Sequence, residues 1–592
     1  FIGLADWMYR LTENLSDDQL QGMLASEHGG LTEVFADAAA LSGDKRFMDM
    51  AKRFSHKRVL DPLLKGEDHL TGMHANTQIP KVIGYKRIAD LEGYADWDKA
   101  AAYFWETVVD NRSITIGGNS VREHFHPADD FSSMLESEQG PETCNTYNML
   151  RLTKMLYETS ADTHYMDYYE RAVYNHILST LNPIQGGFVY FTPMRAGHYR
   201  VYSQPQTSFW CCVGSGMENH ARYGEMIYSH KGDEELFVNL FIPSVLTWGD
   251  TKVEQINNFP AEEGTSLVVS PEKARKFTVA IRIPEWAGKM EVKVNGKVAE
   301  TVSEGGFLKV TRKWVKGDKV EVSLPMSLRA VSLPDQSDNY SFMYGPVVLA
   351  AEIGRQEQIG MYADDSRGGH IAAGRQLPLQ EMPVIVGNKD DILSNITKVE
   401  GKDLTFKLTG TAPAKYKEMT LVPFTSLHEC RYMVYWPVLS EDQWKERVAR
   451  QEEEEKARLA LEMITTDKVT CGEQQPESDH FVAMDRSRNG DHNGRHWRMA
   501  MPEGWFSYTM NTRGHEVKYL RIICTGRDGS EATVTMNGIE AGSFKTGTPN
   551  TEEIHLIPVP QQVAGEGQII IKISSAAGKA SPMIYETRLV IE

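Results

Sequence analysis

Cysteine is scarce in this chain, with 6 residues among 592, which excludes the small secreted proteins that disulfides hold together. Runs of eighteen or more apolar residues are missing as well, so we expect no membrane-spanning helix. Basic residues do not balance the acidic ones, because Lys plus Arg number 63, Asp plus Glu number 81, and the net charge is −18. This charge argues against nucleic acid or an anionic membrane as a partner.

The chain begins at Phe1, without an initiator Met or a signal peptide, in a stretch with the pattern of an amphipathic helix. We therefore expect that a part of the protein precedes residue 1 of this numbering. The beginning of the chain carries no information about export. A chain of 592 residues has the length for three or four domains with large cores.

The first part of the chain, residues 1–231, is predicted to be helical, because its apolar residues recur at helical spacing. Successive helices without strands are typical of an α/α toroid. The eight or nine helices expected here are fewer than the twelve of such a toroid, so we expect its C-terminal portion only. Predicted helices include 45–55, 76–92, 96–110, 143–158, 163–181 and 216–229.

From about residue 232 the apolar pattern changes to period two, which predicts strands. The fold class is therefore multidomain α + β, with a helical domain followed by β-sandwich modules. The predicted domains are 1–231 (helical), 232–329 (a β-sandwich middle domain), 330–438 (a second β-rich domain), 439–464 (a linking helix) and 465–592 (a C-terminal β-sandwich).

Local signals predict two tight turns and one helix start in the β-rich part. Asn295-Gly296 and Asn537-Gly538 are typical of type I′ hairpin turns. Ser440 and Gln443 are spaced as a capping box, so the linking helix should begin there.

Two of the six cysteines, Cys211 and Cys212, are adjacent and follow Trp210. Ser215 and Glu218 have the spacing of a capping box, which predicts that a helix opens at Ser215. Thiols just before a helix N-terminus lie at the positive end of its dipole, which favours the thiolate.

A third cysteine, Cys144, stands two residues after Glu142. With Cys211 and Cys212 these residues offer one carboxylate and three sulfurs, a possible tetrahedral zinc set. On a regular helix Glu142 and Cys144 would point apart, so they can share a metal only if a helix begins around them. Gly140-Pro141 supplies such a start. A vicinal disulfide and small buried apolar side chains are the alternatives.

Glu123 lies in a loop with His124, His126, Arg122 and Phe125 as close neighbours in sequence. Such a setting can tune a carboxyl group for proton transfer. Two other interpretations remain open, since the two histidines could be metal ligands and Glu123 could be an ordinary carboxylate of a surface loop.

Four motifs in order carry a resemblance to a known family. They are H-A-N-T-Q-I-P at 74–80, G-G-x-S-x-R-E-H-F at 117–125, E-T-C at 142–144 and W-C-C at 210–212. Together they resemble those of bacterial β-L-arabinofuranosidases, the zinc–cysteine glycoside hydrolases of families 127 and 146. The R-E-H-F-H form and the appended β modules look closer to family 146.

The resemblance implies an (α/α)6-barrel catalytic domain and an exo-acting, retaining hydrolase. Such an enzyme would release terminal β-L-arabinofuranose from plant cell-wall glycans, either pectic arabinan or the side chains of arabinoglycoproteins. It also implies a location in the bacterial periplasm or at the cell surface.

The same resemblance implies one Zn²⁺ and a role for each motif residue. Cys211 would be the nucleophile and Glu123 the general acid/base. Sugar contacts would come from His74, Tyr190 and His124. The implied zinc ligands are Glu142, Cys144, Cys211 and Cys212.

Two alternatives stand beside this interpretation. An enzyme with the same fold and zinc site could act on a different terminal sugar. A non-catalytic carbohydrate-binding protein could hold a closed, structural zinc, although such a site has no reason to place its cysteines beside an acid such as Glu123.

Overall fold

The computed structural model describes residues 1–592 except 27, 367, 493–494, 527–528 and 548–550. The chain forms two compact units. The first consists of Phe1–Leu70, His74–Leu377 and Glu381–Lys445, and the second of Thr71–Met73, Pro378–Gln380 and Glu446–Glu592.

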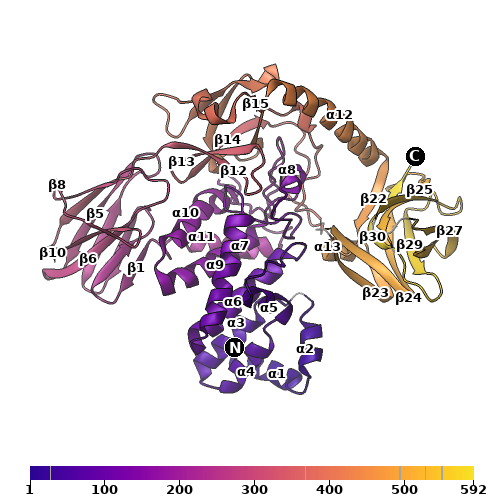
Figure 1. Ribbon diagram of the computed structural model, residues 1–592, viewed down its shortest axis with the longest axis horizontal. Coiled ribbons are helices and arrows are strands. Elements are labelled where there is room, and N and C mark those ends of the chain that lie inside the picture. Colours follow the sequence, from indigo (N-terminus) through magenta and orange to yellow (C-terminus); the bar gives the residue numbers. More distant parts are fainter. Residues whose placement is uncertain (27, 367, 493–494, 527–528, 548–550) are drawn as a thin grey trace. The chain divides into compact units, whose positions relative to one another are not determined.

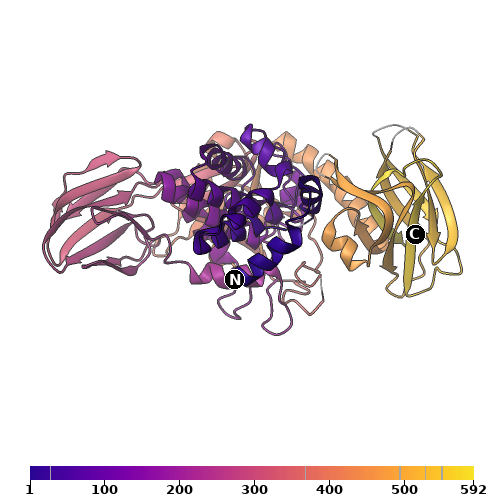
Figure 2. The same cartoon turned by 90° about the horizontal axis from the view of Figure 1, so that it is seen from below.

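The first unit opens with a helical region, whose helices form one group in Figures 1 and 2. The long helices α6 and α9 pack side by side, and α6 also contacts α3 and α7. The helices are α1 (Ile2–Thr12), α2 (Asp17–Met23), α3 (Leu31–Ser42), α4 (Lys45–Arg53), α5 (Lys57–Leu64), α6 (Ala75–Glu92), α7 (Ala95–Asn111), α8 (Ser132–Glu136), α9 (Thr143–Ser160), α10 (Thr163–Arg171), the π-helix η1 (Ala172–Ile177) and α11 (Cys211–Ala221).

The helices predicted over 45–55, 76–92, 96–110 and 143–158 are confirmed by α4, α6, α7 and α9. The prediction of one α-helix over 163–181 is partly wrong. The α-helix α10 ends at Arg171, and the π-helix η1 follows it directly. In that π-helix the Asn175 side chain donates to the carbonyl of Pro346 and accepts from the amide of Val348, at 2.9 and 2.7 Å. The prediction for 216–229 is partly wrong, since α11 covers Cys211–Ala221 and so begins and ends earlier than predicted.

A β-sandwich follows, made of two sheets with the orders β1-β2-β6-β10-β9 and β3-β4-β5-β11-β7-β8. Buried and less buried residues alternate along β4 and β5, as expected of strands with one face on a core. The strands are β1 (Tyr228–Lys231), β2 (Glu235–Val238), β3 (Ser244–Trp248), β4 (Thr251–Ile256), β5 (Gly264–Pro271), β6 (Arg275–Arg282), β7 (Glu291–Val294), β8 (Lys297–Val298), β9 (Val302–Glu304), β10 (Phe307–Trp314) and β11 (Asp318–Ser323).

A buried arginine joins this sandwich to the helical region. Arg282 of β6 has no exposed surface, and its guanidinium lies 2.5 Å from the Asp167 carboxylate and 2.6 Å from that of Glu170, both on α10. Separation of α10 from β6 would leave these buried charges without partners, which is unfavourable. The contact therefore stabilises the packing of α10 on β6.

The second β-rich region is one sheet built around β14, whose first five residues are all buried. Such burial on both faces is expected of a central strand. The elements are β12 (Leu328–Ser332), β13 (Asn339–Tyr344), β14 (Val347–Gly354), η2 (Leu379–Glu381), β15 (Val384–Val386), η3 (Lys389–Asn395), β16 (Ile396–Lys398), β17 (Phe406–Thr409), β18 (Thr411–Ala412), η4 (Ala414–Tyr416), β19 (Glu418–Pro423), η5 (Phe424–Ser426), β20 (Arg431–Met433) and β21 (Trp436–Leu439).

The second unit is a β-rich module that the helix α12 leads into. Its main sheet has the order β27-β26-β29-β24-β30-β25-β28, with β22 paired to β30 and β23 to β24. The elements are α12 (Glu441–Ile464), β22 (Thr465–Thr470), α13 (Gln474–Asp479), β23 (Ala483–His492), β24 (Arg495–Asn511), β25 (Tyr519–Thr525), β26 (Glu531–Met536), β27 (Ile539–Lys545), β28 (Glu552–Pro558), β29 (Gln568–Ser575) and β30 (Met583–Val590).

The local signals of the β-rich part are confirmed. Both residues of each Asn-Gly turn have positive φ, 51° and 77° at Asn295-Gly296 and 48° and 81° at Asn537-Gly538. Ser440 and Gln443 form the predicted capping box at the start of α12. Among the described residues, no helix combines the length and the apolar character that crossing a bilayer requires.

Candidate metal centre and acid site

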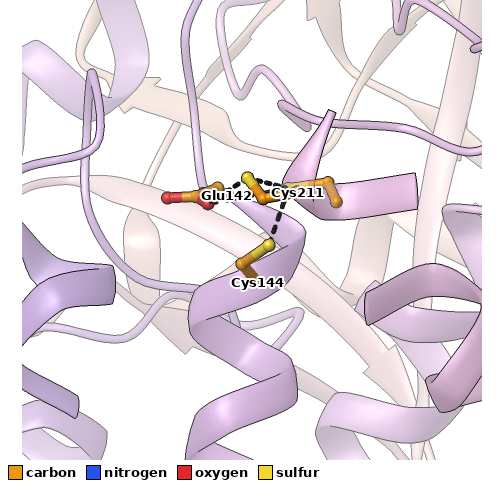
Figure 3. A group of neighbouring side chains, drawn as sticks. Glu142, Cys144 and Cys211 are labelled. Atoms are coloured by element: carbon orange, nitrogen blue, oxygen red, sulfur yellow. Dashed lines mark hydrogen bonds between the residues drawn. The ribbon is translucent and has the colours of Figure 1, made fainter. Parts of the chain in front are cut away.

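Three thiols and one carboxylate meet at one point of the first unit (Figure 3). Glu142, Cys144, Cys211 and Cys212 each offer one ligand atom, and these atoms lie within 4.8 Å of one another. The sulfurs of Cys144 and Cys212 are 3.1 Å apart, and those of Cys211 and Cys212 4.0 Å. Oε1 of Glu142 lies 3.7 Å from the sulfur of Cys211 and 3.6 Å from that of Cys212.

The start of α9 brings the first pair together. Glu142 is the N-cap residue of α9 with an extended backbone, and Cys144 is the second residue of the helix. A helix therefore begins around these two residues, as the Gly140-Pro141 signal predicts. The amide of Thr143 donates to the carbonyl of Tyr190 at 3.0 Å, which fixes this helix start against the neighbouring segment.

The start of α11 supplies the second pair. Cys211 and Cys212 are the first two residues of this helix, so the capping box predicted at Ser215 is wrong. The helix begins four residues earlier, and the Ser215 hydroxyl lies 3.2 Å from the sulfur of Cys144. The thiols still lie in the first turn, where unpaired amides and the helix dipole favour negative charge.

The cluster favours a thiolate on Cys211. Hydrogen bonds from the Cys144 and Cys212 thiols lower the pKa of Cys211 to about 2, and the Tyr190 hydroxyl adds a smaller contribution. Burial raises the pKa values of Glu142 and Cys212. The pKa of Cys144 is raised mainly because its proton is shared with Cys211. Because four acidic groups cannot all ionise so close together, the negative charge collects on one sulfur.

The donor set fits a metal ion. Tetrahedral coordination with metal–sulfur bonds of about 2.3 Å places sulfurs about 3.8 Å apart, and the observed separations are 3.1 and 4.0 Å. Oε2 of Glu142 is buried and has no hydrogen-bond partner among the described residues, although buried carboxylate oxygens normally have one. A cation would also remove the repulsion among the four groups.

Glu123 lies in a loop with unusual backbone geometry. Ser120, Arg122 and Glu123 all have positive φ, at 76°, 48° and 68°. Residues other than glycine rarely adopt this conformation, and it is concentrated at functional sites. The Glu123 carboxylate accepts a hydrogen bond from the Tyr190 hydroxyl and lies 3.7 Å from Nε2 of His74.

The histidines named from the sequence divide into two groups. His74 is the N-cap of α6, where its Nδ1 accepts from the amide of Thr77 at 3.3 Å, and its ring lies 5.2 Å from that of His124. His126 instead packs on Phe131, with ring centroids 4.3 Å apart. The structure therefore brings His74 and His124 to Glu123, and His126 is separated from them.

Tyr190 connects the acid to the thiols. Its hydroxyl donates to Glu123 and also lowers the pKa of Cys211. Burial raises the pKa of Tyr190, so the hydroxyl stays protonated and remains a donor. The Glu123 charge contributes to the raised pKa of Glu142, so the acid and the thiol cluster belong to one site.

Sequence patterns did not indicate two buried residues that support this site. His176 of the π-helix is fully buried and bonds to the hydroxyls of Thr146 and Thr192, at 2.7 and 3.2 Å. Burial lowers the pKa of His176 to about 3, so its ring is neutral. His370 lies against Tyr190, from far along the chain. Neither residue belongs to a recognisable motif.

Comparison with known protein families covers most of the chain. Residues 1–225 match the model described as β-L-arabinofuranosidase, GH127 catalytic domain, and residues 235–326 match that of the GH127 middle domain. Residues 329–438 match a domain of unknown function, and residues 460–590 match a family of unknown function. No curated protein sequence matches the chain.

Several solved structures share the fold. A GH127 β-L-arabinofuranosidase from Geobacillus stearothermophilus T6 is 18% identical, with a TM-score of 0.52, over 69% of this chain and 72% of that chain. A second GH127 β-arabinofuranosidase is 20% identical, with a TM-score of 0.52, over 69% of each chain. A glycoside hydrolase is 17% identical, with a TM-score of 0.55, over 74% and 78%. The shared fold is a helical N-terminal domain followed by β-rich domains.

The lowered pKa of Cys211 predicts how its reactivity depends on pH. A group with a lowered pKa stays ionised as the pH falls, so iodoacetamide should alkylate Cys211 at nearly the same rate from pH 8 to pH 5 in metal-free protein. An ordinary thiol, with a pKa of about 8.5, would slow about tenfold per pH unit over this range. Peptide mapping by mass spectrometry measures the rate, with Cys212 as the internal comparison. A tenfold fall per unit at Cys211 would contradict the assignment.

Proposed function

The chain carries the catalytic and middle domains of the GH127 β-L-arabinofuranosidase family and is a glycoside hydrolase; from this premise we propose that it releases terminal β-L-arabinofuranose from plant cell-wall glycans. We further propose the family 146 type, with an (α/α)6-barrel catalytic domain, a bound zinc and a retaining mechanism. A periplasmic or cell-surface location remains a prediction from the family resemblance.

One observation carries the proposal: a thiol with a strongly lowered pKa lies in the same site as a carboxylate held by a tyrosine. Retention requires a nucleophile and an acid/base on opposite sides of the anomeric carbon, a pair usually supplied by two carboxylates. Cys211 and Glu123 supply the same two functions here, and Tyr190 connects them. A carbohydrate-binding protein with a purely structural metal has no use for this pairing.

In the first step the Cys211 sulfur attacks the anomeric carbon while Glu123 donates a proton to the departing oxygen. The carbon–oxygen bond breaks, a carbon–sulfur bond forms, and the aglycone leaves as an alcohol. The Tyr190 hydroxyl orients the Glu123 carboxyl group through their hydrogen bond. His74, close to the same carboxyl group, and His124, whose ring meets that of His74 edge to face, are placed to contact the sugar hydroxyls.

In the second step Glu123, now ionised, removes a proton from water. The water oxygen bonds to the anomeric carbon, and the carbon–sulfur bond breaks with its electron pair returning to Cys211. Two inversions at this carbon give net retention. Zinc, which Glu142, Cys144, Cys211 and Cys212 would hold, supplies positive charge that stabilises the thiolates and so favours departure of the sulfur.

Trapping of the glycosyl–enzyme tests the function directly. A β-L-arabinofuranosyl epoxide of the cyclophellitol type should label Cys211, because its sulfur is the exposed and ionised one of the pair. Hydrolysis of p-nitrophenyl β-L-arabinofuranoside should give the retained product by NMR. Furanosides and pyranosides of other sugars serve as comparison substrates. Inverted product, or an adduct on Cys212 or a carboxylate, would overturn the mechanism, and preference for another sugar would overturn the substrate.

Metal analysis tests the zinc site. The purified protein should contain about one zinc per chain, because four ligands fill a single tetrahedral shell. Cys144→Ser and Cys212→Ser should each lose the metal and the activity together. Cys471→Ser changes an equally buried thiol of the second unit and should retain both. Full activity in protein shown to be free of zinc would end this part of the proposal.

A substitution at Glu123 tests the acid/base. Glu123→Gln should lower kcat/KM by about 10²–10⁴ on alkyl arabinofuranosides, whose leaving groups need protonation. The loss on a dinitrophenyl arabinofuranoside should be far smaller, because that aglycone departs unaided. Glu136→Gln alters a carboxylate in α8 of the same long loop and is the matched control. Equal losses on both substrates for Glu123→Gln, or the selective loss in Glu136→Gln, would place the acid elsewhere.

A further inference from the structure

The domain that matches a model of unknown function reaches the candidate active site through one segment. This segment, residues 355–377, follows β14 and is described except at residue 367. The described residues of this segment form no helix or strand, yet several of them contact the helical region. We call it the 355–377 segment.

Arg431 of β20 binds the two ends of the 355–377 segment together. Its side chain is fully buried and donates to carbonyls from both ends of the segment, at Gln356 (2.8 Å), Glu357 (2.7 Å) and Arg375 (2.9 Å). A fourth hydrogen bond, of 2.9 Å, goes to the carbonyl of Gly197 in the helical region. One guanidinium therefore binds both ends of the segment to the loop that precedes the cysteine pair.

Tyr199 likewise binds two positions near opposite ends of the 355–377 segment. Its buried hydroxyl donates to the carbonyl of Ile359 at 2.6 Å and accepts from the amide of Gly374 at 2.7 Å. The Arg431 guanidinium lies 4.9 Å from the Tyr199 ring centroid, a favourable cation–π geometry. The two residues together fix where the segment leaves and re-enters its own domain.

The next part of the segment pairs with the residues that lead to Cys211. The amide of Tyr202 donates to Met361 at 2.8 Å, and the amide of Ala363 donates to Tyr202 at 2.9 Å. The carbonyl of Ala363 also accepts from the side chains of Gln204 and Ser208, at 2.6 and 3.3 Å. These bonds fix residues 202–208, which lie just before α11 and its first residue Cys211.

His370 then lies against the aromatic side chains of the site. It is 5% exposed, and its ring centroid is 4.4 Å from that of Tyr190, 5.6 Å from that of Phe191 and 5.5 Å from that of Trp210. The next residue, Ile371, packs on the apolar cluster that includes Cys144 and Cys212.

From these contacts we propose that the domain of residues 329–438 completes the active site, with His370 as the positioning residue of Tyr190. This inference rests on the proposed function. Packing of the His370 ring against the Tyr190 ring, at a tilt of 36°, keeps the tyrosine hydroxyl directed at Glu123. The hydrogen bonds between the 355–377 segment and residues 202–208 keep Cys211 at a fixed position relative to Glu123. Small displacements of such groups cost large factors in rate.

A double-mutant cycle with Tyr190 tests the positioning role. His370→Ala should lower kcat on a β-L-arabinofuranoside by about 10–100-fold, since misplacement by an ångström can cost about 10². His370→Phe should recover most of the rate, because it keeps a ring against Tyr190. In a Tyr190→Phe background His370→Ala should cost less than about twofold, because residues that act through one another are not additive. The full loss in that background would overturn the proposal.

Hydrogen exchange supplies a readout that does not need turnover. Amides of residues 199–212 should exchange faster in His370→Ala than in the wild type. Leu408→Ala empties a fully buried position of the same domain, in β17, and should leave both exchange in 199–212 and kcat unchanged. Unaltered exchange in His370→Ala, or an equal increase in Leu408→Ala, would overturn the positioning role. If the wild type cleaves no arabinofuranoside while His370→Ala alone accelerates exchange, the proposed function fails and the structural role of the segment is supported.

Discussion

Repulsion among four acidic groups at one point, three of them buried, is the constraint on which the rest of this structure depends. Glu142, Cys144, Cys211 and Cys212 approach one another closely enough to share a single cation. Without one, protons must be distributed among them, and hydrogen bonding leaves the negative charge on Cys211. A fold that keeps such a cluster must hold it against its own electrostatics. Two helix starts supply its residues, and Ile371 of the 355–377 segment packs beside it.

Features fixed by neighbouring residues could be predicted from the sequence. The Asn295-Gly296 and Asn537-Gly538 turns follow from the tolerance of these residues for positive φ, and the start of α12 follows from the Ser440 side chain. The metal set could be assembled because Pro141 marks the start of α9 beside Glu142. Each of these signals operates within a few residues of the chain.

Features fixed by distant contacts could not be predicted. A local capping pattern placed the start of α11 at Ser215, but the Ser215 hydroxyl interacts with Cys144 and the helix begins at Cys211. His370 is separated from Tyr190 by 180 positions, and nothing around it in the sequence indicates that the two rings pack together. The fold class is therefore accessible from periodicity, whereas the outer parts of the site depend on tertiary packing.

The π-helix η1 sets a limit on changes in chain length. A π-turn contains one residue more than an α-turn, and deletion of one residue from Ala172–Ile177 would allow α10 to continue as a regular helix. Each residue of an α-helix turns by about 100°, so His176 would rotate away from Thr146 and Thr192. Asn175 would at the same time leave Pro346 and Val348, which it binds in the second β-rich region. Sequence drift in this segment is therefore more tolerable as substitution than as a one-residue deletion.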